Sequence, residues 1–193
     1  MKKILFFSNS PDKLIEIKSL FKNFSTKVYS PKDFWISHEP KELGKSFAEN
    51  AKIKSSYGYK STKIPCFADD SGISIEALNW KPNIYSKRFI ESFKNRNECF
   101  KYIINKIKQS GKFKAHFKTS VCLTLSNASH IIFEGKINGT ISIRPKGKNG
   151  FGYDPIFIPI NAKKTFAEIN KKEKNRLSHR SIAINKLINF LFN

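Results

Sequence analysis

Two adjacent carboxylates, in the segment Ala68-Asp-Asp-Ser-Gly72, are the side chains best suited to chemistry. They follow an apolar stretch typical of a strand, and Ser71 and Gly72 favour a turn directly after them. Carboxylate oxygens are the ligands that Mg²⁺ prefers. Because successive side chains of an extended chain point to opposite faces, we do not expect both to bind a metal in the same way. Asp70, nearer the turn, is the better candidate, and plain turn chemistry is the alternative.

A second acidic group, Glu42, precedes Gly44 in a loop. The nearby pattern Ser46-Phe-Ala-Glu49 is a capping box, so Glu49 is expected to cap the helix that follows, and Lys54 lies further along that helix. Glu42 is therefore the better candidate for a second metal ligand. A solvated loop acid is the alternative interpretation.

A phosphate site is predicted between the first strand and the first helix. This loop contains Ser8, Asn9, Ser10, Pro11, Asp12 and Lys13. A helix N-terminus offers backbone N–H groups and partial positive charge, and a lysine on the first turn adds a full charge. The loop lacks the glycines of a P-loop, so an ordinary strand-to-helix turn is the alternative.

Aromatic and basic residues near the C-terminus could hold a flat ligand. The first group contains Phe151, Gly152, Tyr153 and Asp154, and the second contains Lys174, Ser178, His179 and Arg180. Glycines allow close backbone approach, and an aromatic ring can stack on a base. Ser178 is a good N-cap, which would place the next two side chains on the first turn of the last helix. A tight turn with core aromatics, followed by a solvated basic run, is the alternative.

The composition is globular, with 193 residues, 39% of them hydrophobic, and a formal net charge of +21. The lysines are spread along the chain, which is typical of a biased genome composition, although small phosphorylated ligands or nucleic acid could also use the charge. Cys66, Cys99 and Cys122 lack metal-like spacing and are expected to be reduced thiols. The apolar run ending at Phe7 is too short for an export segment. We therefore expect a cytoplasmic protein with no membrane span and no specific nucleic-acid partner.

Periodicity predicts one mixed α/β domain over residues 1–193 with a long twisted sheet. Helices are expected from Pro11, over Ser46–Tyr59, around Phe100–Ile107, at a second capping box Thr165–Glu168, and from Ser178 to about Leu191. Strands are expected at Lys3–Phe7, Lys27–Tyr29, Pro65–Asp69, Ile73–Glu76, Phe113–Leu125, His130–Ile137 and Thr140–Ile143, with a Gly-rich loop, Lys146–Gly152, before Tyr153–Ile158.

In this order and spacing, the motifs resemble the inosine triphosphate pyrophosphatase family, also called the Ham1 family. The similarity covers nearly the whole chain. It is carried by the Ser8–Lys13 loop, Ser46–Lys54, Ala68–Gly72, Tyr85-Ser86, Phe151–Phe157 and Thr165–Arg180. The most specific pair is Phe-Gly-Tyr-Asp-Pro-Ile-Phe followed by Ser-His-Arg.

The resemblance implies hydrolysis of ITP, dITP and XTP to the monophosphate and pyrophosphate. It also implies Mg²⁺, an elongated two-lobed fold with a cleft between the lobes, and a homodimer. Carried over by position, Asp70 is expected to be catalytic and to bind the metal with Glu42. The remaining implied substrate-binding residues are Ser8, Asn9, Ser10, Pro11, Asp12, Lys13, Lys54, Ser71, Phe151, Gly152, Tyr153, Asp154, Lys174, His179 and Arg180. Because Arg180 and His179 can donate to a 6-carbonyl, we expect them at the base end.

The chain departs from the family pattern at two places. Asn9 and Ser10 stand where Gly and Asn are usual, and Asn79-Trp-Lys-Pro82 replaces a Gly-rich segment. Asn tolerates a left-handed backbone better than most residues, so the loop could persist. A Maf-type nucleotide pyrophosphatase and a basic nucleic-acid-binding protein are the competing interpretations. The first is disfavoured by the Ser-His-Arg motif, and the second leaves Asp69-Asp70 unexplained.

Overall fold

The computed structural model describes residues 2–193, which divide into two compact units. The first unit comprises the described residues as far as Asp70, together with Thr119–Gly135 and Arg180–Asn193. The second comprises Ser71–Lys118 and Lys136–His179. Strands β3 (Cys66–Ile75), β5 (Lys114–Thr124) and β6 (His130–Ile141) contribute residues to both. The order of hydrogen-bonded strands is β2-β1-β3-β5-β6-β7, with β4 paired to β3.

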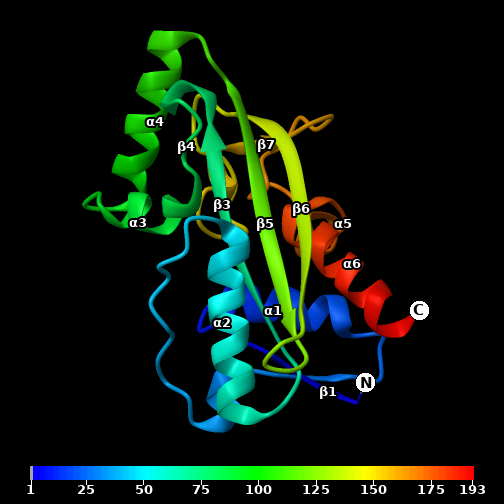
Figure 1. Ribbon diagram of the computed structural model, residues 1–193. Helices are drawn as coiled ribbons and strands as arrows, with labels where there is room; N and C mark the ends of the chain where they lie inside the picture. Colours follow the sequence, from blue (N-terminus) through cyan, green and yellow to red (C-terminus); the bar gives the residue numbers. More distant parts are fainter. Residues whose placement is uncertain (1) are drawn as a thin grey trace. The chain divides into compact units, whose positions relative to one another are not determined.

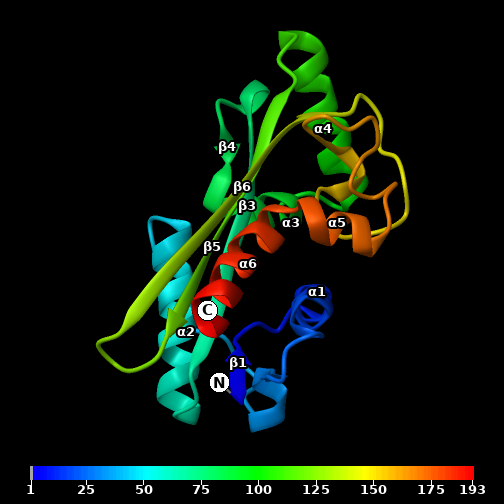
Figure 2. The same ribbon diagram turned by 90° about the vertical axis from the view of Figure 1, so that its right-hand side faces the viewer.

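The first unit is built on parallel strands covered by helices. Strand β1 (Lys3–Phe6) pairs in parallel with β2 (Lys27–Tyr29) and with β3. Phe6 and Phe67 pack with α1 (Pro11–Phe21) and α6 (His179–Phe192), whereas Leu5 and Ala68 pack with α2 (Phe47–Thr62). Figure 2 shows α1 and α6 on the side of β3 opposite to α2. Both faces are thus buried, as parallel strands require.

The second unit is an antiparallel arrangement of strands that share one apolar cluster with two of its helices. Its further strands are β4 (Lys81–Pro82), paired with β3, and β7 (Phe157–Pro159), paired with β6. Its helices are α3 (Ser86–Glu91), α4 (Arg96–Ser110) and α5 (Lys171–Leu177), labelled in Figure 1. Alternate residues of β5, Ala115 and Phe117, face Phe100 and Ile103 of α4 in the core. Short 3-10 helices of this unit are Glu76–Leu78, Asn83–Tyr85 and Asp154–Ile156, and the first unit contains one at Pro31–Phe34.

The mixed α/β class is confirmed, with helices starting at Pro11 and following Ser46 as predicted. The turn predicted at Asp70-Ser-Gly72 is wrong, because β3 continues through it to Ile75. Gly72 instead permits close approach, since a Cβ there would lie 2.2 Å from the carbonyl oxygen of Asn83. Its neighbour Ile73 donates its N–H to Ser86 Oγ at 2.8 Å. This glycine therefore serves packing within the second unit.

Three other boundaries differ from prediction. The strand predicted at Thr140–Ile143 is the end of β6, which runs unbroken to Ile141. Within Tyr153–Ile158, a 3-10 turn precedes β7. The Thr165–Glu168 box forms its reciprocal bond, from Thr165 N–H to Glu168 Oε2 at 2.8 Å, but makes only a turn. The helix starts later, at α5, because Asn170 accepts the N–H of Glu173 and caps it.

Candidate active site

Asp69 and Asp70 point to opposite faces of β3, as the strand period predicts. Asp69 shares its face with Phe67 and contacts α1 and α6. Asp70 shares its face with Ala68 and contacts α2. Each carboxylate therefore has its own partners, and the two differ in charge environment.

Asp69 is fully buried in a network of cations. It accepts from Lys13 Nζ at 2.9 Å and from Arg180 Nε at 3.0 Å. Arg180 also pairs through Nη1 with Glu16 Oε2 at 2.5 Å. Although burial opposes ionisation, Lys13, Arg180 and Lys54 together hold the pKa of Asp69 far below its usual range. Asp69 is thus a permanent anion that joins α1, β3 and α6.

Asp70 lies in a polar cluster on the other face of β3. It accepts from Asn50 Nδ2 at 2.9 Å, and Lys54 Nζ lies 4.0 Å from its Oδ1 and 2.6 Å from Glu42 Oε1. Burial and repulsion from Glu42 raise the pKa of Asp70, although Lys54 and Asn50 partly offset them. Burial lowers the pKa of Lys54, but Asp70, Asp69 and Glu42 outweigh it and raise the pKa. A carboxylate that is difficult to ionise is suited to accept a proton.

The donor set around Lys54 fits a hard divalent cation with few protein ligands. Asp70 and Glu42 provide carboxylate oxygens that contact the same ammonium group. Among residues 2–193, there is no group of three or more Asp, Glu, His or Cys side chains that could hold a metal ion by themselves. Mg²⁺ commonly binds one or two carboxylates and completes its shell with water and substrate phosphates. The pair Asp70 and Glu42 satisfies that requirement.

The predicted phosphate loop forms a capped helix start. Ser10 caps α1 by accepting the N–H of Lys13 at 3.4 Å, and Pro11 occupies the first turn. Asn9 does not belong to the described residues with positive φ, so tolerance of a left-handed backbone is not what maintains the loop. Instead, Asn9 contacts the segment Ser37–Glu39 through both its backbone N–H and its side chain. Lys13 reaches from this loop to Asp69.

In the second unit, Lys174 connects the predicted aromatic segment to α5. Lys174 Nζ pairs with Asp154 Oδ2 at 2.7 Å, with both side chains buried, and lies 4.6 Å from the centroid of the Phe151 ring. Asp154 Oδ2 also accepts the N–H of Phe151 at 2.7 Å. Gly150 has φ +72°, and a Cβ there would lie 2.1 Å from that same oxygen. Gly150, Asp154 and Lys174 therefore together hold the Phe151 ring in place.

Two predicted substrate contacts are largely core residues. Tyr153 is buried, and its hydroxyl donates to the carbonyl oxygen of Ser86 at 2.7 Å, within the apolar cluster of the second unit. Burial raises the pKa of Tyr153 well above its usual range. The buried His179 ring stacks on Phe117 with a centroid distance of 4.6 Å and an interplanar angle of 7°. Ser71 lies half-buried in β3 rather than in a turn.

The structure groups the predicted residues by unit. The first unit holds two clusters, Lys13 with Arg180 around Asp69 and Glu42 with Lys54 beside Asp70, and the second unit brings together Phe151, Asp154 and Lys174. Sequence reasoning missed Asn50, Glu16 and Glu39. Asn50 could have been found, because it lies four residues before Lys54 and therefore on the same helix face. Glu16 and Glu39 carry no sequence signal.

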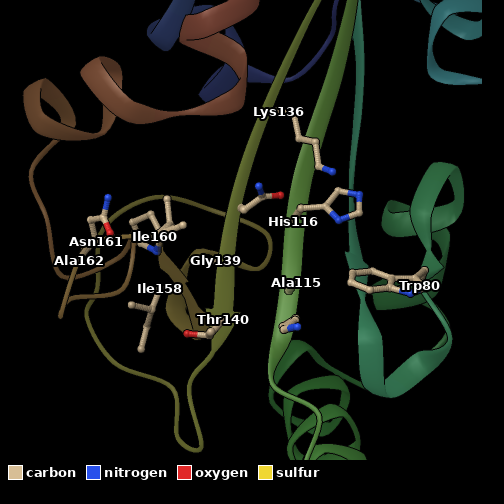
Figure 3. Close-up of a pocket in the computed structure, with 13 residues that line it drawn as sticks. Trp80, Ala115, His116, Lys136, Gly139, Thr140, Ile158, Ile160, Asn161 and Ala162 are labelled. Atoms are coloured by element: carbon tan, nitrogen blue, oxygen red, sulfur yellow. The ribbon is translucent and has the colours of Figure 1, made fainter.

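A separate cavity lies in the second unit, on β5, β6 and β7 (Figure 3). Its volume is about 740 Å³. The lining residues are Trp80, Lys114, Ala115, His116, Lys136, Asn138, Gly139, Thr140, Ile158, Pro159, Ile160, Asn161 and Ala162. Within the described chain, this lining contains none of the predicted site residues, so the cavity is distinct from the candidate site.

Solved structures with this fold define the class of protein. A HAM1 protein from Coxiella burnetii matches with a TM-score of 0.88 and 33% identity, covering 99% of this chain and 98% of that one. The Ham1 protein of Staphylococcus aureus matches with a TM-score of 0.85 and 33% identity, covering 98% of each chain.

The family is shown by sequence as well. The sequence model of the Ham1 family matches residues 4–190, and the chain belongs to the Ham1 family. A dITP/XTP pyrophosphatase of Thermoanaerobacter pseudethanolicus is 36% identical over 98% of this chain and 96% of its own length. A dITP/XTP pyrophosphatase of Flavobacterium psychrophilum is 35% identical over 98% of this chain and 99% of its own length. No helix among the described residues is long and apolar enough to cross a membrane.

Proposed function

We propose that this protein is a nucleoside-triphosphate pyrophosphatase that hydrolyses the non-canonical purine nucleotides ITP, dITP and XTP to the monophosphate and pyrophosphate. One observation carries the proposal. Asp70 lies beside Glu42 and Lys54 in a polar cluster. The chain that holds this cluster belongs to the Ham1 family, and relatives that match it over nearly their whole length are named dITP/XTP pyrophosphatase. The Maf-type and nucleic-acid-binding alternatives are not favoured, because the family match extends over residues 4–190.

The residues of the first unit suit the phosphate end of the substrate. Lys13 and the N-terminus of α1 supply positive charge for the triphosphate. Asp70 and Glu42 are the residues that would hold Mg²⁺, which when bound neutralises phosphate charge and lowers the pKa of water. Asp70 accepts a proton from the attacking water. The oxygen of that water bonds to the α-phosphorus, and the bond between this phosphorus and the pyrophosphate leaving group breaks.

The buried anion Asp69 serves this chemistry indirectly. Burial lowers the pKa of Lys13, and the ion pair with Asp69 opposes this effect. Asp69 thus keeps the Lys13 ammonium charged and in place. Arg180 donates to Asp69 and Glu16. The Nε and Nη1 atoms of the Arg180 guanidinium donate to carboxylates, which supports a positioning role, and a contact with the base stays a prediction. We therefore assign Arg180 to positioning Asp69.

The residues of the second unit suit the nucleoside end. The ring of Phe151, held by Asp154 and Lys174, offers a stacking surface for a purine. Lys174 and His179 are potential donors to a 6-carbonyl, which hypoxanthine and xanthine carry and adenine does not. A donor facing an amino group would disfavour ATP more than a difference in size would.

Purified protein should release pyrophosphate from ITP, dITP and XTP at least about tenfold more efficiently than from ATP or GTP, a ratio worth about 1.4 kcal/mol. The measurement is kcat/KM for each nucleotide under identical Mg²⁺ conditions, with pyrophosphate detected enzymatically. A protein that turns over all five purine nucleotides equally would contradict the proposed specificity.

Removing divalent metal should abolish turnover. The carboxylates of Asp70 and Glu42 repel the triphosphate unless a divalent cation lies between them and the phosphates. Activity on dITP in excess EDTA should therefore fall by at least about a hundredfold. Dialysis followed by added MgCl₂ should restore it. Full activity in EDTA, with metal content verified by elemental analysis, would contradict the assignment of Asp70 and Glu42 as ligands. A homodimer, which rests on the family resemblance, and a cytoplasmic location, which rests on the short apolar run ending at Phe7, stay predictions.

A further inference from the structure

A carboxylate of the protein itself contacts the loop assigned to the substrate's phosphates. Glu39 Oε1 accepts the backbone N–H of Asn9 at 2.5 Å. Asn9 directly precedes Ser10, the N-cap of α1, where the helix dipole favours an anion. The side-chain Nδ2 of Asn9 also donates to the carbonyl oxygen of Ser37 at 3.5 Å. Both donors of Asn9 thus tie the Ser37–Glu39 segment to the loop.

The surroundings make this bond exchangeable. Glu39 and Asn9 are both exposed, so water and solutes have access to the N–H and the carboxylate. The next amide, that of Ser10, donates to Ser8 Oγ at 3.2 Å within the loop. Lys13 is held by Asp69 rather than by Glu39. Glu39 therefore competes for the Asn9 amide specifically, without neutralising the lysine of the loop.

We propose that Glu39 is an internal competitor of the substrate's phosphate groups. It occupies the Asn9 amide in the absence of nucleotide, and the triphosphate must displace it to bind. The inference rests on the proposed function, because it takes the Ser8–Lys13 loop as the phosphate site. A phosphate oxygen and a carboxylate oxygen are both anionic acceptors, and one N–H donates at full strength to only one of them.

Glu39 thereby sets substrate affinity rather than the rate of the chemical step. Glu42, three residues further along, is anchored separately by Lys54 at 2.6 Å. Loss of the Glu39 bond leaves that contact and Asp70 unchanged. The effect of Glu39 is therefore expected in KM and in the dissociation constant for polyphosphate, with kcat unchanged.

The test uses Glu39→Ala with Glu98→Ala as its matched control. Glu98 lies on α4 and pairs with Lys101 at 3.0 Å, so the control removes the same charge without touching Asn9. Sodium tripolyphosphate is titrated calorimetrically into each full-length protein at one fixed concentration of MgCl₂. The ionic strength is about 0.15 M, to screen general attraction. We expect the Glu39→Ala dissociation constant to fall about three- to tenfold, as for one exchanged surface hydrogen bond, and the control to match wild type.

An unchanged or higher dissociation constant in Glu39→Ala, or an equal fall in Glu98→Ala, would overturn the inference. Kinetics on dITP add a second readout, in which Glu39→Ala should lower KM and leave kcat as in wild type. The two proposals fail separately. A wild-type protein that does not hydrolyse dITP refutes the proposed function, whereas the tripolyphosphate titration still decides the role of Glu39.

Discussion

Replacing Asp70 by Asn is expected to lower kcat/KM for dITP by at least about a hundredfold, the scale of a lost proton acceptor or metal ligand. Asn keeps the size of the side chain and can still interact with Asn50, but it cannot accept a proton from water. The same variant should be no less stable than wild type. Burial and Glu42 raise the pKa of Asp70, so the folded state disfavours its ionised form and loses little when the charge is removed.

The matched control for activity is Asp33→Asn, which makes the same substitution in a carboxylate that caps a 3-10 helix through Ser30. After correction for the folded fraction, its kcat/KM should equal that of wild type. Steady-state kinetics and thermal melts on the three proteins decide the matter. Near-wild-type turnover in Asp70→Asn would refute the catalytic assignment.

Replacing the neighbouring Asp69 by Asn is expected to have the opposite signature, a loss of about 3–5 kcal/mol in the free energy of unfolding. The substitution leaves Lys13 and Arg180 largely buried without the anion that they share. Denaturant unfolding at pH 7 measures the change. Asp70→Asn is the natural control, because the same substitution one residue away should cost little.

The pH dependence of this loss has a definite sign. The folded-state pKa of Asp69 lies below its unfolded value of about 3.9. Its contribution to stability is therefore fully present above that pH and diminishes as the pH falls below it. The difference between wild type and Asp69→Asn should accordingly be large at pH 7 and shrink in acid. A difference independent of pH would show that packing, rather than charge, accounts for it.

The sequence was sufficient where local periodicity governs the structure. The alternation of an extended chain predicted that Asp69 and Asp70 would face different partners, and capping residues predicted where α1 and α2 begin. The same local reasoning failed at Gly72. Its Ser-Gly context favours a turn, whereas the glycine is needed because the carbonyl of Asn83 approaches β3 closely.

Long-range ion pairs were beyond local reasoning. The contact between Arg180 and Glu16 joins residues 164 positions apart, and it is one observation behind the positioning role that we propose for Arg180. The contact between Glu39 and Asn9 of the Ser8–Lys13 loop joins residues 30 positions apart, and no sequence motif indicates it. The helix predicted at the Thr165–Glu168 capping box begins later, as α5, because the box forms only a turn and Asn170 supplies the N-cap.

The most direct test of the proposed reaction is the identity of its products. dITP is incubated with the purified protein and MgCl₂, and phosphorus NMR follows the mixture until the substrate is consumed. The account predicts dIMP and pyrophosphate in equal amounts, with no dIDP at any time. Appearance of dIDP with orthophosphate would place bond cleavage at the terminal phosphate and would contradict the assignment as a pyrophosphatase.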